Sequence, residues 1–405
     1  MDSMSLQPEL AERVRRRLAE SGGPVTSARV AAVLREETRG VVGDADLLEL
    51  LREAQSEFVG AGPLEQLLRD PATTDVLVNG PDEVWVDQGQ GLTRVAVRFD
   101  DDAAVRRLAQ RLASSAGRRL DDSRPWVDAT LADGTRLHAV LPPIAEPTTC
   151  LSLRAFRARA FTLDELVDLG TLTDASAAVL RLVLDARLAF LITGGTGSGK
   201  TTLLASLLGC VDPGERIVLV EDAGELRPAH PHVLRLVARP PNVEDAGEVT
   251  LRDLVRQALR MRPDRVVVGE VRGAEVVDLL TALNTGHDGG CGTLHANGPD
   301  ELPARLEALG ALGGLTADAL HSQLAAAVQV ALHLVRDSAG QRGLAEVCVL
   351  DRPDGRVRPR IAWSRTNGVG AGAAELTRLL RSRGISPARI VEAGLPAGPA
   401  IGVPW

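Results

Sequence analysis

Aromatic residues are scarce in this chain, which has five Phe, four Trp and no Tyr among its 405 residues. Valine, leucine and alanine therefore have to fill the core, and such side chains suit helices packed on a buried parallel sheet. Single-stranded nucleic acid is usually bound by stacking its bases on aromatic rings, so the scarcity argues against direct nucleic-acid binding. The net charge of −8 argues in the same direction, because a nucleic-acid binder usually presents a basic face.

Cysteines and long apolar runs are also few. The four cysteines are widely separated, and none shows the paired spacing of a zinc site or redox motif. Reduced thiols in a reducing cytoplasm are expected. No uninterrupted apolar run approaches the roughly 20 residues of a membrane-spanning helix, and no apolar signal core follows the N-terminus. We therefore expect a cytoplasmic protein that reaches a membrane only through a partner or a surface patch.

Lysine is almost absent, because the 46 Lys and Arg residues include a single lysine, Lys200. It lies in the segment GGTGSGKT, residues 194–201, which fits the phosphate-binding loop of nucleoside triphosphatases, G-x-x-x-x-G-K-[ST]. An apolar run precedes this loop and a helix-forming run follows it, as the motif requires. Glycines let backbone N–H groups converge on a phosphate, and a compact ammonium reaches between phosphates where a planar guanidinium does not.

The sequence therefore predicts a site for ATP and Mg²⁺ at this loop. Thr201 is expected to offer its hydroxyl to the metal ion. The predicted nucleotide-binding residues are Gly194, Gly195, Thr196, Gly197, Ser198, Gly199, Lys200, Thr201 and Thr202.

Carboxylates follow two further apolar runs. Glu270 comes after Val266–Val268 and is predicted to orient the attacking water or accept its proton. Glu221, Asp222 and Glu225 follow the run 217–220. Adjacent carboxylates beside phosphates are compatible only where Mg²⁺ screens them, so Asp222 is predicted as a metal ligand. A solvated acidic turn is the alternative for this cluster.

Two histidines and two arginines complete the candidate residues. His287 and His295 lie in a Gly-rich stretch, eight positions apart, which is not a metal-ligand spacing. They are predicted to sense the γ-phosphate or to couple neighbouring subunits, with ordinary surface histidines as the alternative. Arg136 and Arg154, farther upstream, can approach a γ-phosphate within or across subunits. Surface ion pairs are the alternative in so arginine-rich a chain.

Several of these segments together resemble the secretion ATPases of type II and type IV systems, in particular the TadA/CpaF ATPases of tight-adherence pili and an actinobacterial, conjugal-transfer-associated subgroup. The resemblance extends over residues 58–350 and includes an upstream domain. Its motifs are GGTGSGKTT (194–202), LVEDAGEL (219–226), LRDLVRQALRMRPDRVVVGEVRGAE (251–275), NTGHDGGCGTLHAN (284–297), AGPLEQLLRDPATTDVLVNGPDEVWV (61–86), GRRLDDSRPWVDATLADGTRLHAVLPP (117–143) and LSLRAF (151–156).

The resemblance implies an α/β protein, with a RecA-like P-loop ATPase domain preceded by a smaller α+β N-terminal domain and a helical extension. The expected parts are the extension 1–57, the N-terminal domain 58–158, a linker 159–175, the ATPase domain 176–350 and a Gly/Pro/Arg-rich tail 351–405. It further implies a homo-hexamer that hydrolyses ATP and drives inner-membrane platform proteins from the cytoplasmic face of the membrane.

The family also supplies roles for the candidate residues. Lys200 and Thr201 correspond to its phosphate and Mg²⁺ holders, and Glu270 to its catalytic carboxylate. Glu221, Asp222 and Glu225 resemble its acidic box near the metal and the water, and His287 and His295 resemble its histidine box. The two upstream arginines match N-terminal-domain arginines that are expected to approach the γ-phosphate.

Two departures stand out. Thr130 occupies a position where the family often has arginine, and Arg154-Ala155-Phe156 has one basic residue where the family tends to have two before Phe. Loss of an arginine finger slows phosphoryl transfer by roughly 10³–10⁵-fold in systems that depend on one, so slow hydrolysis is expected. A conjugative DNA-transfer motor and an ATP-binding regulatory or localisation protein with low turnover stay open as alternatives.

Overall fold

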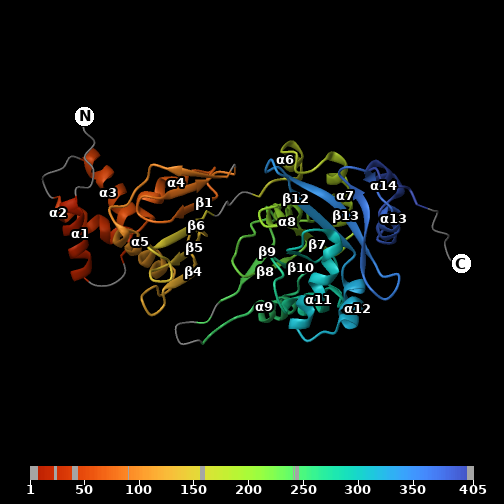
Figure 1. Ribbon diagram of the computed structural model, residues 1–405. Helices are drawn as coiled ribbons and strands as arrows, with labels where there is room; N and C mark the ends of the chain where they lie inside the picture. Colours follow the sequence, from red (N-terminus) through yellow and green to blue (C-terminus); the bar gives the residue numbers. More distant parts are fainter. Residues whose placement is uncertain are drawn as a thin grey trace. The chain divides into compact units, whose positions relative to one another are not determined.

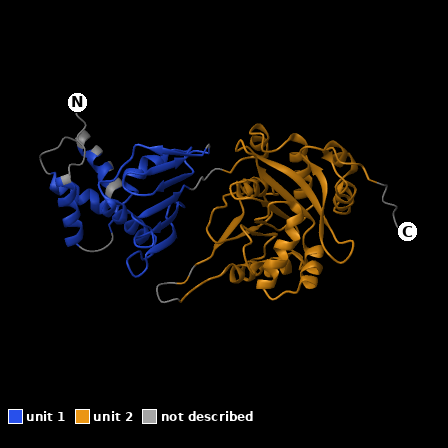
Figure 2. Ribbon diagram, in the orientation of Figure 1, with its two compact units in different colours: residues 1–157 blue, residues 158–405 orange. Residues whose placement is uncertain are grey.

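The computed structural model describes residues 8–21, 25–38, 44–89, 91–155, 160–239, 241 and 246–398. The chain forms two compact units, residues 1–157 and 158–405 (Figure 2). Each unit has hydrophobic clusters of its own, so each is built around separate cores.

Unit 1 begins with three helices, and this confirms the predicted helical extension. Thr26 caps the second helix, since its side chain accepts a hydrogen bond from the backbone N–H of Arg29. The apolar side chains of the three helices meet in a small core that includes Val14, Leu34 and Phe58. The helices are α1 Pro8–Glu20, α2 Ser27–Glu37 and α3 Asp44–Phe58.

The rest of unit 1 is a six-stranded antiparallel sheet in the order β3-β2-β1-β6-β5-β4. Burial alternates along the strands at the period of two that a half-covered sheet requires. One face packs on α5, Asp102–Ser115. The 3₁₀-helix Gly62–Leu64 leads into α4, Glu65–Arg69. The strands are β1 Asp75–Val78, β2 Val84–Asp87, β3 Leu92–Val95, β4 Trp126–Thr130, β5 Arg136–Val140 and β6 Cys150–Arg154.

Unit 2 contains a nine-stranded sheet in the order β15-β14-β13-β12-β7-β11-β10-β8-β9. The strands from β12 to β9 in this order are parallel, and β13, β14 and β15 add an antiparallel edge. This is the predicted α/β architecture. The strands are β7 Phe190–Gly194, β8 Ile217–Glu221, β9 Val233–Val237, β10 Arg265–Val268, β11 Cys291–Leu294, β12 Val330–Arg336, β13 Arg342–Asp351, β14 Arg358–Ser364 and β15 Gly368–Val369.

Helices cover both faces of this sheet (Figure 1), so its central strands are buried along their whole length. One face packs on α6 Leu163–Asp168, α7 Asp174–Asp185, α8 Lys200–Gly209, α13 Ala373–Ser382 and α14 Pro387–Glu392. The other packs on α9 Leu251–Ala258, α10 Glu275–Leu283, α11 Leu302–Leu312 and α12 Ala317–Ala327. Two 3₁₀-helices, Leu259–Met261 and Pro299–Glu301, lie between these elements.

The boundaries predicted at residues 175 and 351 do not separate parts of unit 2. β13 ends at Asp351, and β14, α13 and α14 then continue on the same core, where Leu376 and Ile390 are fully buried. Leu163 and Leu166, predicted to lie in a linker, belong to that core too. The segment after residue 351 is rich in Gly, Pro and Arg, and its few apolar residues are too sparse to indicate in the sequence that it belongs to the core. Residues 399–405 of the predicted tail lie outside the described part of the chain.

Within the described part of the chain, no helix combines the length and apolar composition needed to cross a membrane.

Candidate functional site

The glycine-rich loop connects β7 to α8 at the carboxyl edge of the parallel strands. Its backbone needs glycine at three points, because Gly197 and Gly199 have φ of 71° and 96° and Gly194 has no space for a side chain. A Cβ at Gly194 would lie 2.4 Å from the carbonyl oxygen of Leu334. The Oγ of Ser198, in the middle of the loop, is buried without a hydrogen-bond partner in the described structure. The loop thus brings glycine backbone to the N-terminus of α8, where an anion is favoured.

The side chain of Lys200 lies inside this loop. Its Nζ donates hydrogen bonds of 2.9 Å to the carbonyl oxygens of Gly194 and Gly195, and it lies 3.5 Å from Nδ1 of His295. Only 7% of the residue is exposed, and burial lowers the pKa of its ammonium group, a shift that nearby Glu270 opposes. The contact with His295 brings together two residues that lie 95 positions apart in the sequence.

Glu270 lies just beyond β10 and next to this pair. Its Oε1 is 2.9 Å from Nε2 of His295, and its Oε2 forms an ion pair with Arg272. Burial alone would raise the pKa of the carboxyl, but Arg272, His295 and Lys200 outweigh it, so the pKa is lowered and the group stays ionised. Although His295 is close, Oε1 has no partner of good hydrogen-bond geometry among the described residues. This buried oxygen therefore has an unfilled place for a hydrogen-bond donor.

The ring of His295 connects the lysine to the carboxylate. Burial and the charge of Lys200 both lower its pKa, so the neutral ring is favoured. In the neutral tautomer with a proton on Nε2, Nδ1 accepts from Lys200 and Nε2 faces Glu270. The four side chains Lys200, His295, Glu270 and Arg272 therefore form one continuous polar chain at the edge of the sheet.

Glu221, at the end of β8, has a different environment from Glu270. Its Oε1 accepts hydrogen bonds from the backbone N–H groups of Glu225 and Leu226, at 2.9 and 2.8 Å, which closes the loop that follows β8. Its Oε2 is buried without a partner in the described structure. The carbon stem leaves no space at Gly269, where a Cβ would lie 2.8 Å from Cγ of Glu221. These contacts favour a loop-holding role over the predicted role at the metal and water.

A pH-dependent stability follows for Glu221, because burial raises its pKa from 4.5 to about 7. The folded protein binds a proton that the unfolded chain lacks between these values, so this contribution to stability is complete below pH 4.5 and lost as the pH rises through 7. The free energy of unfolding should therefore fall by roughly 3 kcal/mol across this interval relative to Glu221→Gln. Urea unfolding of both proteins at a series of pH values measures this. A difference that does not vary with pH would contradict it.

Asp222 and Glu225 lie on the loop after Glu221, and their charges act on Arg272. In the described residues, no group of three or more His, Cys, Asp and Glu side chains is arranged to hold a metal ion. Mg²⁺ commonly binds through one or two protein oxygens, with phosphates and water supplying the others. The Thr201 hydroxyl in the first turn of α8, with Asp222 near Arg272, fits that sparse arrangement. A bound Mg²⁺ would neutralise charge on the phosphates.

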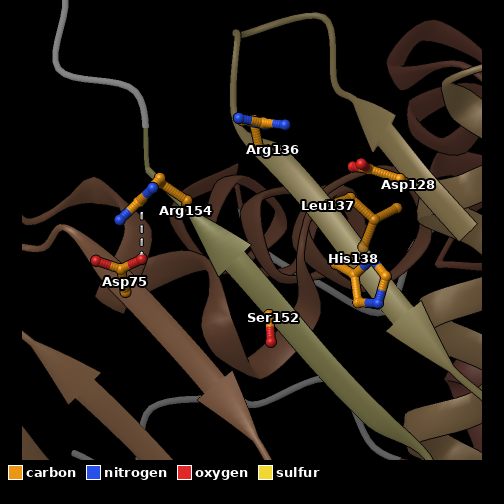
Figure 3. A pocket seen from close by; sticks show the side chains of 7 residues that line it. All are labelled: Asp75, Asp128, Arg136, Leu137, His138, Ser152 and Arg154. Carbon is orange, nitrogen blue, oxygen red and sulfur yellow. Dashed lines mark hydrogen bonds and ion pairs between the residues drawn. The ribbon is translucent and has the colours of Figure 1, made fainter. Parts of the chain in front are cut away.

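Arg136 and Arg154 lie in unit 1, on the exposed face of its sheet. They are direct neighbours across β5 and β6, and they line a cavity of about 230 Å³ together with Asp75, Asp128 and other residues of the same face (Figure 3). Arg154 donates to Asp75 over 3.1 Å. Thr130 is paired with Arg136 in the register of β4 and β5. The two predicted arginines are thus adjacent, as a shared contact with an anion requires.

His287 does not lie with the other predicted residues. It precedes the first residue of β11, whereas His295 follows the last, so the strand separates them at opposite edges of the sheet. Its Nδ1 lies 3.1 Å from the carbonyl oxygen of Ala282, and the adjacent Asp288 pairs with Arg383 at 2.7 Å. The structure therefore brings His295, and not His287, into contact with Lys200 and Glu270.

Two residues that the structure brings to the site have no separate predicted role. Arg272 lies two residues after a strand-end carboxylate, and that position is a signal in the sequence that could have found it. His333 lies in an apolar strand, β12, with nothing in the local pattern to distinguish it. It reaches the site because β12 is the parallel neighbour of β7, with His333 opposite Thr193.

The fold and the site define a protein in which a RecA-like P-loop domain follows a smaller N-terminal unit in the sequence. The family model described as "Type II/IV secretion system protein" matches residues 57–378. A protein described as a putative conjugal transfer protein of Mycobacterium tuberculosis (strain CDC 1551 / Oshkosh) is 63% identical over 317 residues, which cover 77% of this chain and 90% of that protein. The chain therefore belongs to the type II/IV secretion system protein family, as the sequence motifs indicated.

A more distant relative agrees with this assignment, and two solved structures share the fold. The type IV secretion system protein PtlH of Bordetella pertussis (strain Tohama I) is 37% identical over 258 residues, or 57% of this chain and 75% of PtlH. The pilus retraction motor PilT with bound ADP shares the fold, with a TM-score of 0.53 and 21% identity over 81% of this chain and 95% of PilT. The ATPase DotB of Legionella pneumophila has a TM-score of 0.52 and 19% identity over 82% and 90% of the two chains.

Proposed function

We propose that this chain is a Mg²⁺-dependent ATPase that powers pilus assembly or protein secretion. The observation that carries the proposal is the polar chain in which Lys200, at the base of the phosphate loop, contacts His295, and His295 contacts Glu270. A phosphate on the loop would replace the two glycine carbonyls as the partner of Lys200. Glu270, ionised and with a buried Oε1 that lacks a hydrogen-bond partner in the described structure, would then orient the nucleophile.

The motor is proposed to act as a homo-hexamer on inner-membrane platform proteins, at the cytoplasmic face of the membrane. Membership of the secretion family supports this assembly. A tight-adherence pilus system is the proposed setting.

A conjugative DNA-transfer motor is the second candidate, and the description of the Mycobacterium tuberculosis relative as a putative conjugal transfer protein favours it. The net charge of −8 and the scarcity of aromatic residues oppose direct DNA contact. Filter binding of DNA at two salt concentrations separates the candidates, because binding through phosphates weakens steeply with salt. Strong, salt-sensitive binding would favour the DNA motor.

The proposed activity predicts phosphate release from ATP that requires Mg²⁺ and is lost with EDTA. Because Thr130 stands opposite Arg136 in place of a possible arginine finger, turnover should be slow, and Thr130→Arg should raise it. Steady-state phosphate release from both proteins measures the turnover. The molecular mass of both proteins in solution with ATP shows whether they form the same assembly. Wild-type turnover that Thr130→Arg leaves unchanged would show that the absent arginine does not limit the rate.

A further inference from the structure

The hairpin formed by β12 and β13 runs past the end of β7 and lies beside the phosphate loop. β7 ends at Gly194, which is opposite Leu334, and β12 continues for two further residues to Arg336. Arg336 pairs with Arg342, the first residue of β13. The end of this hairpin therefore places two arginines next to a loop that is predicted to bind phosphate.

Arg342 contacts the phosphate loop directly. Its Nε donates a hydrogen bond of 2.8 Å to the carbonyl oxygen of Gly197. Its carbon chain also lies against a second glycine of the loop, because a Cβ at Gly199 would be 3.4 Å from Cδ of Arg342. The bond joins residues that lie 145 positions apart in the sequence, so the local motif of the phosphate loop contains no signal for it.

The hairpin that carries Arg342 is itself held in place. Within its turn, the backbone N–H of Asp337 donates to the carbonyl of Gln341 at 2.9 Å, and the N–H of Gln341 donates to Oδ1 of Asp337 at 2.8 Å. Two residues further along β13 than Arg342, the N–H of Leu344 donates to the carbonyl of Thr171 over 2.9 Å. The guanidinium group therefore extends from a fixed piece of backbone, so its bond can hold the phosphate loop in one position.

The bond to Arg342 also determines which way the next amide of the loop points. The peptide bond between Gly197 and Ser198 is trans, and in a trans peptide the carbonyl and the following N–H point in opposite directions. The carbonyl of Gly197 points to Arg342. The N–H of Ser198 therefore points the other way, into the loop, and donates over 3.4 Å to the carbonyl of Gly195. Nζ of Lys200 donates to the same carbonyl at 2.9 Å, so the two donors converge on one point inside the loop.

We propose that Arg342 is a positioning residue, which holds the carbonyl of Gly197 outside the phosphate loop and thereby aims the N–H of Ser198 at a bound phosphate. The phosphate would replace the Gly195 carbonyl as the acceptor of this N–H and of the Lys200 ammonium group. Backbone N–H groups of such a loop cradle the α- and β-phosphates, so Arg342 acts on nucleotide binding and not on the attacking water. The proposal rests on the proposed ATPase function for this effect, but the bond itself can be tested in the ligand-free protein.

Two substitutions of similar length separate the hydrogen bond of Arg342 from its charge. Arg342→Gln places an amide N–H at the position of Nε and removes the charge, whereas Arg342→Met places a methyl group there. We expect Arg342→Met to weaken ADP binding and to raise KM for ATP by about 5- to 10-fold. Its kcat should stay within about twofold of wild type, because the lost contact is made equally before and during the reaction. Arg342→Gln should bind ADP like wild type. An equal loss of affinity in both variants, no loss in Arg342→Met, or a loss confined to kcat would overturn the proposal.

Arg352→Met is the control for the exchange of arginine for methionine. Arg352 is exposed and follows the opposite end of β13 from Arg342. Its Nε makes the same kind of bond, to the carbonyl oxygen of Gly355 over 2.8 Å. The control should leave the affinity for ADP and the KM for ATP unchanged. A loss of affinity as large as that of Arg342→Met would assign the effect to the exchange itself and overturn the proposal.

Hydrogen exchange of the ligand-free protein tests the bond without nucleotide. At short labelling times, the amides of residues 196–199 should exchange faster in Arg342→Met than in wild type or Arg342→Gln, while exchange in β8 is unchanged. Equal exchange of this segment in all three proteins would overturn the proposal, whatever their affinity for ADP. Faster exchange in Arg342→Met, together with no nucleotide binding by wild type, would sustain the role of Arg342 in the loop and reject the ATPase function instead.

Discussion

Glu270→Gln should abolish nearly all ATP turnover while leaving nucleotide affinity close to that of wild type. The amide preserves the volume and the contact with His295 but cannot accept a proton, and it removes the charge that pairs with Arg272. Groups that accept a proton in the transition state contribute about 10²–10⁴-fold to a rate, and kcat should fall by that factor. Phosphate release and binding of a fluorescent ATP analogue measure the two quantities separately.

The control for this substitution is Glu248→Gln, which changes an exposed carboxylate after β9 and should alter neither quantity. Equal and negligible turnover in wild type and Glu270→Gln would contradict the prediction. It would favour the alternative that the chain binds ATP as a regulatory or localisation protein. A large loss of affinity in Glu270→Gln would show instead that the carboxylate organises the empty site through Arg272 and His295.

The part of this site that could be predicted consists of residues that lie close together in the sequence. The phosphate loop, its preceding strand and its following helix form one local pattern, and strand-end acids such as Glu270 lie at the same edge because parallel strands end together. The pattern could not distinguish Glu270 from Glu221, because both follow apolar strands. What separates them is tertiary: backbone N–H groups hold Glu221, whereas cations surround Glu270.

Two differences between the expected and the observed arrangement have a common physical cause. His287 and His295 belong to one short motif, yet a four-residue strand between them places them at opposite edges of the sheet. A glycine-rich stretch conceals such a strand, because Gly292 contributes no side chain to the apolar pattern. Likewise the segment after Asp351 has few apolar residues, but Leu376, Leu380 and Ile390 are spaced so that all reach one core.

Lys200→Arg should remove nucleotide binding and turnover, although it keeps the charge and gives this position the cation that the chain uses everywhere else. The ammonium group lies at 2.9 Å from two adjacent carbonyl oxygens and is almost fully buried. A guanidinium is broader, planar and fixed in its donor directions, so it cannot enter that space without displacing the loop. Losing one preorganised donor to a transition state typically costs about 10²–10³-fold in kcat, and displacement of the loop adds a loss of affinity.

An exchange of arginine for lysine far from the phosphate loop serves as the control for Lys200→Arg. It separates the effect of the buried geometry at Lys200 from the effect of exchanging the two residue types. Arg352→Lys, at an exposed turn between β13 and β14 where Nε donates to the carbonyl of Gly355, should leave affinity and turnover unchanged. Comparing Lys200→Arg with Arg352→Lys then shows whether the effect depends on the place of the exchange and not on the exchange of lysine and arginine itself. In a chain that otherwise uses only arginine for positive charge, the one lysine indicates a site where arginine fails. Binding and hydrolysis of ATP by Lys200→Arg at the wild-type level would remove that argument, and with it the assignment of Lys200 as the phosphate anchor.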